Sequence, residues 1–154
     1  MRLILLCLLF ACSQASSQIT VRANDKTVKL DANSLADLPR QIAVLNDHGK
    51  QVNYEGVLVH DVLVRSGVDF GTGLRGKQLS TYVVATGSDG YQVVYALADF
   101  DPSITSSAII LADRRDGKPL DDHEGPQRIV VPQDKRPARS LRLLKEIDVV
   151  QLNK

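Results

Sequence analysis

The feature that most constrains the fold of this chain is a pair of apolar runs on either side of a tight turn. Their pattern fits β-strands better than helices. The runs cover residues 82–85 and 91–96, and Asp89-Gly90 between them favours a short hairpin loop. Both runs are apolar at successive positions and do not alternate with polar residues. We therefore expect a hairpin of two central strands covered on both faces.

Further short segments with strand or helix patterns flank this hairpin. The remaining strands are predicted at residues 19–22, 27–30, 41–45, 51–54, 108–112, 128–131 and 143–152. A helix is predicted over 57–66 before Gly67, and shorter helical turns are predicted at 34–37 and 97–101. The chain has 154 residues and no internal repeat. The sequence thus predicts one α+β domain with a mixed β-sheet and few short helices.

The first 17 residues have the pattern of a secretory signal peptide. Arg2 precedes an apolar run at 3–11, and small and polar residues follow. This run is too short to span a bilayer. Cleavage after Ala15 or after Ser17 and lipid anchoring through Cys12 stay open as alternatives. We expect residues 18–154 to form a single exported domain, periplasmic or secreted, with no membrane span.

Removal of this leader changes the charge and the cysteine content of the chain. Of the 19 basic residues only Arg2 is lost, which leaves 18 against 18 acidic residues. A formally neutral domain argues against general binding to nucleic acid or to anionic membranes. Cys7 and Cys12 also lie in the leader, so residues 18–154 contain no thiol and no disulfide.

The usual catalytic and metal-binding motifs do not occur in this sequence. His48, His60 and His123 are far apart and lack the spacing of metal ligands. A Gly-x-Ser-x-Gly nucleophile motif is missing, and the glycines at 71–76 do not lie between a strand and a helix. We predict no catalytic residue and no metal ligand.

Basic residues concentrate near the C-terminus. Six of them lie between positions 128 and 145, namely Arg128, Lys135, Arg136, Arg139, Arg142 and Lys145, and Arg114 and Arg115 precede them. Such a patch can bind an anion through charge-assisted hydrogen bonds. The alternative is pairing with nearby acidic residues, and surface pairs of that kind contribute little stability. For the loop at 133–139 we favour a binding role.

An ordered series of motifs in this chain resembles a known family. The motifs are YEGV (54–57) with the following helix, SDGY (88–91), LADFD (97–101), IILADRRDGKPL (109–120), EGPQRIVVP (124–132) and DKRPARSLRLLKEIDV (134–149). Together they resemble the oxidoreductase molybdopterin-binding domain, which has a sulfite-oxidase-like fold. The resemblance covers residues 30–149.

The resemblance implies a pterin cofactor that holds molybdenum and supports oxygen-atom transfer, as in sulfite oxidation or methionine sulfoxide reduction. It also implies a cysteine thiolate on the metal. Counting back along the family pattern from Gly56 leads to Val44, whose side chain has no donor atom. Exported family enzymes load the cofactor before a twin-arginine signal carries them out folded, whereas this leader has a single arginine, which fits unfolded export.

We therefore predict a non-catalytic module that binds a small anion, a pterin-like ligand or a protein partner. No cofactor is expected, although the resemblance implies molybdopterin. The predicted positive side of the site consists of Arg114, Arg115, Arg128, Lys135, Arg136 and Arg139, with Asp89 and Tyr91 lining a remnant pocket. A molybdopterin-dependent oxidoreductase with a cysteine-free site and a structural or assembly protein of the cell envelope remain as alternatives.

Overall fold

The computed structural model describes residues 18–47 and 49–152, so the predicted leader, with Cys7 and Cys12, lies outside the described residues. The described residues form ten strands: β1 (Ile19–Ala23), β2 (Lys26–Leu30), β3 (Arg40–Asp47), β4 (Lys50–Leu58), β5 (Thr81–Gly87), β6 (Gln92–Ala96), β7 (Ile110–Arg115), β8 (Lys118–Pro119), β9 (Arg128–Val130) and β10 (Leu144–Gln151). The α-helices are α1 (Ala32–Leu35) and α2 (Val59–Arg65). Four short 3₁₀ helices complete the fold, η1 (Gly71–Gly73), η2 (Gly76–Ser80), η3 (Leu97–Phe100) and η4 (Pro137–Arg139). No helix among the described residues is long and apolar enough to cross a membrane.

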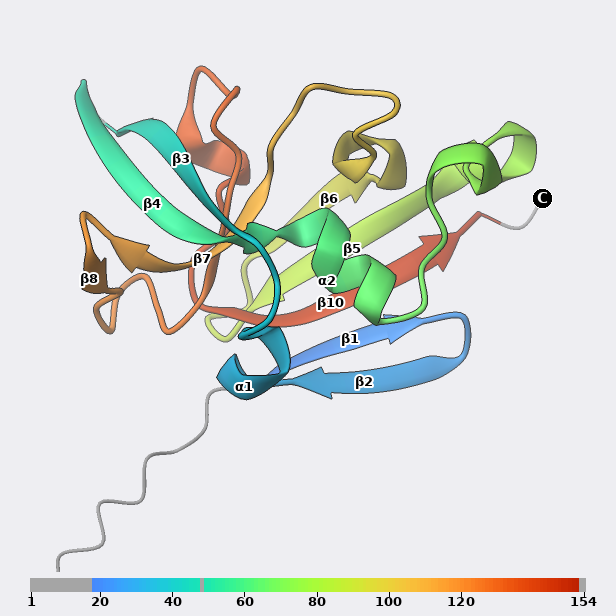
Figure 1. The fold of residues 1–154 in the computed structure, drawn as a ribbon, viewed down its shortest axis with the longest axis horizontal. Helices are drawn as coiled ribbons and strands as arrows, with labels where there is room; N and C mark the ends of the chain where they lie inside the picture. Colours follow the sequence, from blue (N-terminus) through green and yellow to red (C-terminus); the bar gives the residue numbers. More distant parts are fainter. Residues whose placement is uncertain (1–17, 48, 153–154) are drawn as a thin grey trace, which may run out of the picture.

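The strands form two sheets (Figure 1). Sheet A has the order β2-β1-β10-β5-β6, and only its β1–β10 pair is parallel. Sheet B has the order β3-β4-β7-β8, and β9 also pairs with β7. The predicted α+β class with a mixed sheet and few short helices is confirmed.

The larger core lies on the inner face of sheet A. There α2 contributes Val62 and Leu63, which pack with Ile19, Val83 and Ile147 from the strands. Burial of such aliphatic side chains is the main favourable contribution to folding in a chain with few aromatic residues. A smaller core on sheet B groups residues of β3, β4, β7 and β9.

The β5–β6 hairpin forms where the sequence predicts it, but the expectation that both of its faces are covered is wrong. Strand β5 alternates between buried and half-buried residues, and β6 lies at the edge of sheet A. Val83 is fully buried, whereas Val94 is 59% exposed on the outer face. On this outer face Val84 lies opposite Val94 in the register of the two strands.

Two helix predictions are also corrected. The helix predicted at 57–66 begins only at Val59, because residues 56–58 pair with β7 and extend β4 instead. The first helical turn starts earlier than predicted. Its N-cap is Asp31, whose carboxylate accepts a hydrogen bond from the Ser34 backbone at 2.8 Å. Ser34 therefore occupies the N3 position of this capping box and not the N-cap position.

Gly56 allows β4 and β7 to approach closely. A Cβ atom at this position would lie 1.9 Å from the backbone oxygen of Leu111, which no conformational adjustment of a side chain could relieve. The pairing of β4 with β7 shifts register next to Gly56. This contact fixes the position of Tyr54, two residues earlier on the same strand.

Candidate functional site

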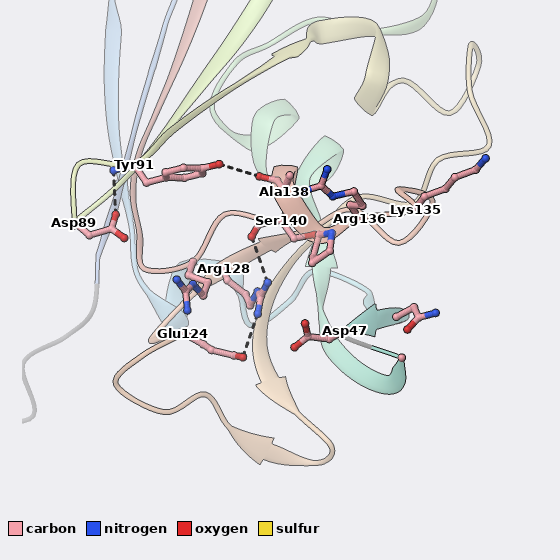
Figure 2. Close-up of a pocket in the computed structure, with 13 residues that line it drawn as sticks. Asp47, Asp89, Tyr91, Glu124, Arg128, Lys135, Arg136, Ala138 and Ser140 are labelled. Carbon is pink, nitrogen blue, oxygen red and sulfur yellow. Dashed lines mark hydrogen bonds and ion pairs between the residues drawn. The ribbon is translucent and has the colours of Figure 1, made fainter.

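A cavity of about 730 Å³ opens between the tips of the β3–β4 and β5–β6 hairpins (Figure 2). The segment around η4 forms another part of its wall. The lining residues are Asn46, Asp47, Gly49, Asp89, Tyr91, Glu124, Arg128, Lys135, Arg136, Pro137, Ala138, Ser140 and Arg142. The volume is in the range of sites that bind small organic molecules, and most of the lining is polar or charged.

Arg128 is the buried cation of this cavity. Its side chain is only 5% exposed. Its Nη1 donates to the Tyr54 hydroxyl at 2.9 Å, and its Nη2 donates to the Ser140 carbonyl at 3.3 Å. The guanidinium also lies over the Tyr54 ring, 4.7 Å from the centroid. Its Nε has no hydrogen-bond partner among the described residues. A buried donor without a protein partner is costly, so this N–H favours an acceptor from a ligand or from water.

Glu124 balances the charge of Arg128 from within the fold. Its carboxylate lies 3.2 Å from Arg128 Nη1, accepts a hydrogen bond from the Tyr54 hydroxyl at 3.2 Å and pairs with Arg115. Burial, the largest cause, raises the pKa of Tyr54 to about 12, so the hydroxyl keeps its proton and can donate to Glu124. The carboxylate is thus fully engaged by neighbours in the protein.

Three further cations line the cavity and are more exposed to solvent than Arg128. Lys135, Arg136 and Arg142 are exposed, and none of them forms an ion pair with a residue in the described part of the chain. All three lie in the segment on either side of η4. Such cations remain available to an anion that enters the cavity.

The η4 segment is fixed by both sheets. On the side of sheet A, the hydroxyl of Tyr91, just before β6, donates to the Ala138 carbonyl at 3.2 Å, and the hydroxyl of Tyr95 in β6 donates to the Arg139 carbonyl. On the side of sheet B, the backbone N–H of Val131, just after β9, donates to the Ser140 hydroxyl at 3.0 Å. These bonds hold the basic segment at the cavity, although η4 itself is a single short turn.

Asp89 lies at the tip of the β5–β6 hairpin. One of its carboxylate oxygens accepts a hydrogen bond from the Tyr91 backbone at 3.1 Å. Gly90 between them has a φ of +84°, which glycine adopts without strain. The turn therefore directs the Asp89 carboxylate and the Tyr91 ring toward the cavity, where both belong to the lining (Figure 2).

Five of the eight predicted site residues line this cavity, and three do not. The lining contains Asp89, Tyr91, Arg128, Lys135 and Arg136. Arg114 is exposed on β7. Arg115 pairs with Glu124 but does not belong to the cavity lining. Arg139 pairs with Asp134 at 2.7 Å and with Asp99 at 3.3 Å instead of facing the cavity.

Several lining residues were missed by the sequence prediction. Arg142 belongs to the basic run at 128–145 and could have been included on that signal. Asn46 and Asp47 follow a predicted strand and come close to the other residues only through the β3–β4 hairpin. Glu124 carries no local signal that separates it from the other acidic residues near it.

The donor groups of this site do not fit a thiolate-held molybdenum. Residues 18–154 contain no cysteine, and the described residues contain no group of three or more side chains suited to a metal ion. Val44 is 44% exposed on β3 and is not part of the cavity lining; Asn46, two residues later, is. No residue present can replace the soft sulfur ligand that the family pattern implies.

The histidines also lie away from the cavity. His60 packs against Phe70, with ring centroids 4.6 Å apart, and its Nδ1 lies 2.8 Å from the Asp61 carboxylate. His123 is exposed, and His48 lies outside the described residues. The described histidines thus have structural or surface positions.

Comparison with known proteins gives the family. The fold is similar to the crystal structure of the sulfane dehydrogenase SoxCD from Paracoccus pantotrophus, with a TM-score of 0.65 and 14% identity. That match covers 86% of this chain and 37% of the longer SoxCD chain, so it establishes the sulfite-oxidase-like fold alone. No curated protein matches the sequence. The family model of the oxidoreductase molybdopterin-binding domain matches residues 14–154. The chain therefore belongs to the oxidoreductase molybdopterin-binding domain family.

Proposed function

We propose that this domain binds a small organic anion in the cavity between the two hairpins and carries out no molybdenum redox chemistry itself. The observation that carries the proposal is Arg128, a buried cation that lines the cavity and whose Nε lacks a hydrogen-bond partner in the described chain. The Nε atom itself is covered, so an oxoanion bound at Arg128 would accept that hydrogen bond after a small shift of the side chains that cover it. Lys135, Arg136 and Arg142 would add charge-assisted contacts at the opening.

The non-catalytic part of the proposal rests on the donor set. A family fold can persist without the family reaction, because chemistry depends on the residues at the site. The phosphate of a pterin-like ligand falls within the anion class that this cavity would accept. A molybdenum atom bound through a protein thiolate does not, because the only cysteines precede residue 18. Export of the domain is part of the same proposal and is supported by the leader sequence alone.

The binding site is tested by calorimetric titration of the protein with propyl phosphate at low ionic strength, which measures the affinity. We expect Arg136→Gln to weaken binding at least about fivefold and to reduce its salt dependence, because one charge-assisted contact is lost. Arg114→Gln is the matched control, since Arg114 loses the same charge but lies outside the cavity. Equal affinities in all three proteins, or no binding, would overturn the proposed site.

The absence of redox chemistry needs a separate test. The protein is purified from an exporting host that makes molybdopterin, and its molybdenum and released pterin are measured. We expect no stoichiometric molybdenum. Near-stoichiometric metal together with pterin would contradict the non-catalytic reading and favour an oxidoreductase with a cysteine-free metal site.

A further inference from the structure

The cavity carries charges of both signs. Four lining residues are cationic, Arg128, Lys135, Arg136 and Arg142, and three are carboxylates, Asp47, Asp89 and Glu124. Four minus three leaves a formal charge of only +1 on a cavity of about 730 Å³. A site complementary to a simple polyanion would not place carboxylates around it, because like charges oppose binding.

These charges do not all neutralise one another by contact. Arg128 and Glu124 form an ion pair with each other inside the cavity wall. Asp89 is exposed, and its recorded hydrogen bond goes to the backbone of Tyr91, a neutral group. Asp89 forms no ion pair with a cation in the described part of the chain, and it belongs to the cavity lining.

Asp89 lies at a different side of the cavity from Lys135 and Arg136 (Figure 2). Figure 2 shows Asp89 on one side and Lys135 with Arg136 on the other, with Arg128 between them. Asp89 lies in the turn between β5 and β6 of sheet A, whereas Arg128 is the first residue of β9 in sheet B. A ligand that extends from Arg128 toward the turn between β5 and β6 would thus meet the Asp89 carboxylate (Figure 2).

We propose that the cavity selects a zwitterionic organic anion, with its anionic group at Arg128 and Arg136 and a protonated amine directed toward Asp89. This inference rests on the proposed anion-binding function and adds the class of ligand. The amine would be recognised by a charge-assisted hydrogen bond to the Asp89 carboxylate. An anion without the amine would approach the same carboxylate with no compensating contact.

The test compares two ligands of nearly the same shape, phosphoethanolamine and propyl phosphate, on the wild-type protein and on Asp89→Asn. The substitution is chosen because an asparagine oxygen can still accept the hydrogen bond from the Tyr91 backbone, so the hairpin turn is retained. Affinities are measured by calorimetry at fixed pH and ionic strength. Arg136→Gln is included in parallel, because it reports on the anionic group alone.

We expect the wild-type protein to bind phosphoethanolamine at least about fivefold more tightly than propyl phosphate. Asp89→Asn should abolish this preference without weakening propyl phosphate, whereas Arg136→Gln should weaken both ligands. If both ligands bind equally to the wild-type protein, or if Asp89→Asn keeps the preference, the zwitterion inference fails while the anion site stands. If neither ligand binds, the proposed function fails together with it.

Discussion

Two arginine clusters, one on each sheet, have similar partners and very different surroundings. On sheet A, Arg22 donates to Asp148 at 3.0 Å and also pairs with Glu146, and its side chain is 48% exposed. On sheet B, Arg128 pairs with Glu124 and Tyr54, and its side chain is 5% exposed. The first cluster leaves every member in contact with water. The second faces a cavity from within the fold.

The difference shows why the number of ion pairs does not identify a site. An exposed pair gains little because water and salt screen it, and either partner can be lost at small cost. A buried charge depends on every partner that replaces its hydration, and a donor left over must be met by a ligand or by water. Arg128 has such a donor, and Arg22 has none that is buried.

Among the substitutions that test this difference between the two clusters, Glu124→Gln is expected to lower stability most. Loss of the carboxylate charge leaves Arg128 buried without its anionic partner, and we expect the free energy of unfolding to fall by about 3 kcal/mol. Chemical denaturation followed by circular dichroism measures this change. A loss close to zero would mean that water reaches Arg128 freely and that the cluster resembles the surface one.

A smaller effect is expected from Tyr54→Phe. The hydroxyl accepts a hydrogen bond from Arg128 and donates one to Glu124, and its removal should cost about 1.5 kcal/mol. The substitution should also change the alkaline behaviour, because the pKa of Tyr54 is raised from 10.0 to about 12.

Between these two pH values the unfolded chain loses a proton that folded Tyr54 keeps. The wild-type protein should therefore lose stability as the pH rises from about 10 toward 12, and Tyr54→Phe should lose less over the same range. Burial also raises the pKa of Tyr95, so part of the wild-type loss remains in the variant. Denaturation midpoints at pH 9 and above measure the difference. An identical alkaline decline in both proteins would show that Tyr54 is not buried as described.

The smallest effect is expected at the surface cluster. Arg22→Gln removes the hydrogen bond that is the main cause of the lowered pKa of Glu146, while burial raises the pKa of neighbouring Asp148. At neutral pH, a carboxyl group whose pKa is lowered by folding stabilises the folded state, and one whose pKa is raised by folding destabilises it. The shifts of Glu146 and Asp148 therefore have opposite effects on the free energy of unfolding. We expect a loss of stability several-fold smaller than for Glu124→Gln at neutral pH. If Arg22→Gln lowered the free energy of unfolding as much as Glu124→Gln does, the two clusters would not differ as described.

The sequence predicts the parts of the fold that depend on local pattern. The β5–β6 hairpin follows from its apolar runs and Asp89-Gly90, and the basic η4 segment stands out by charge alone. The covered faces of that hairpin could not be predicted, because valine fits both a buried strand and the half-shielded outer face of an edge pair. The start of α2 depends on pairing of 56–58 with β7, a long-range contact.

The candidate site was predictable in part for the same reason. Arg128, Lys135 and Arg136 belong to one basic run, so charge pointed to them. Arg139 belongs to it too, yet it pairs with Asp134, five residues away, and with Asp99, 40 residues away. The second of these contacts has no local sequence pattern. Tyr54 lies 74 residues before Arg128 and joins the cluster only because Gly56 lets β4 approach β7.

The central claim is tested most directly at the Nε–H of Arg128, whose resonance can be followed by ¹H–¹⁵N NMR during titration with propyl phosphate. The account predicts a saturable shift of this resonance, because the buried donor gains its acceptor when the anion binds. The same titration of Arg136→Gln should saturate at higher ligand concentration. An Arg128 Nε–H that does not move while the ligand saturates other residues would contradict the account.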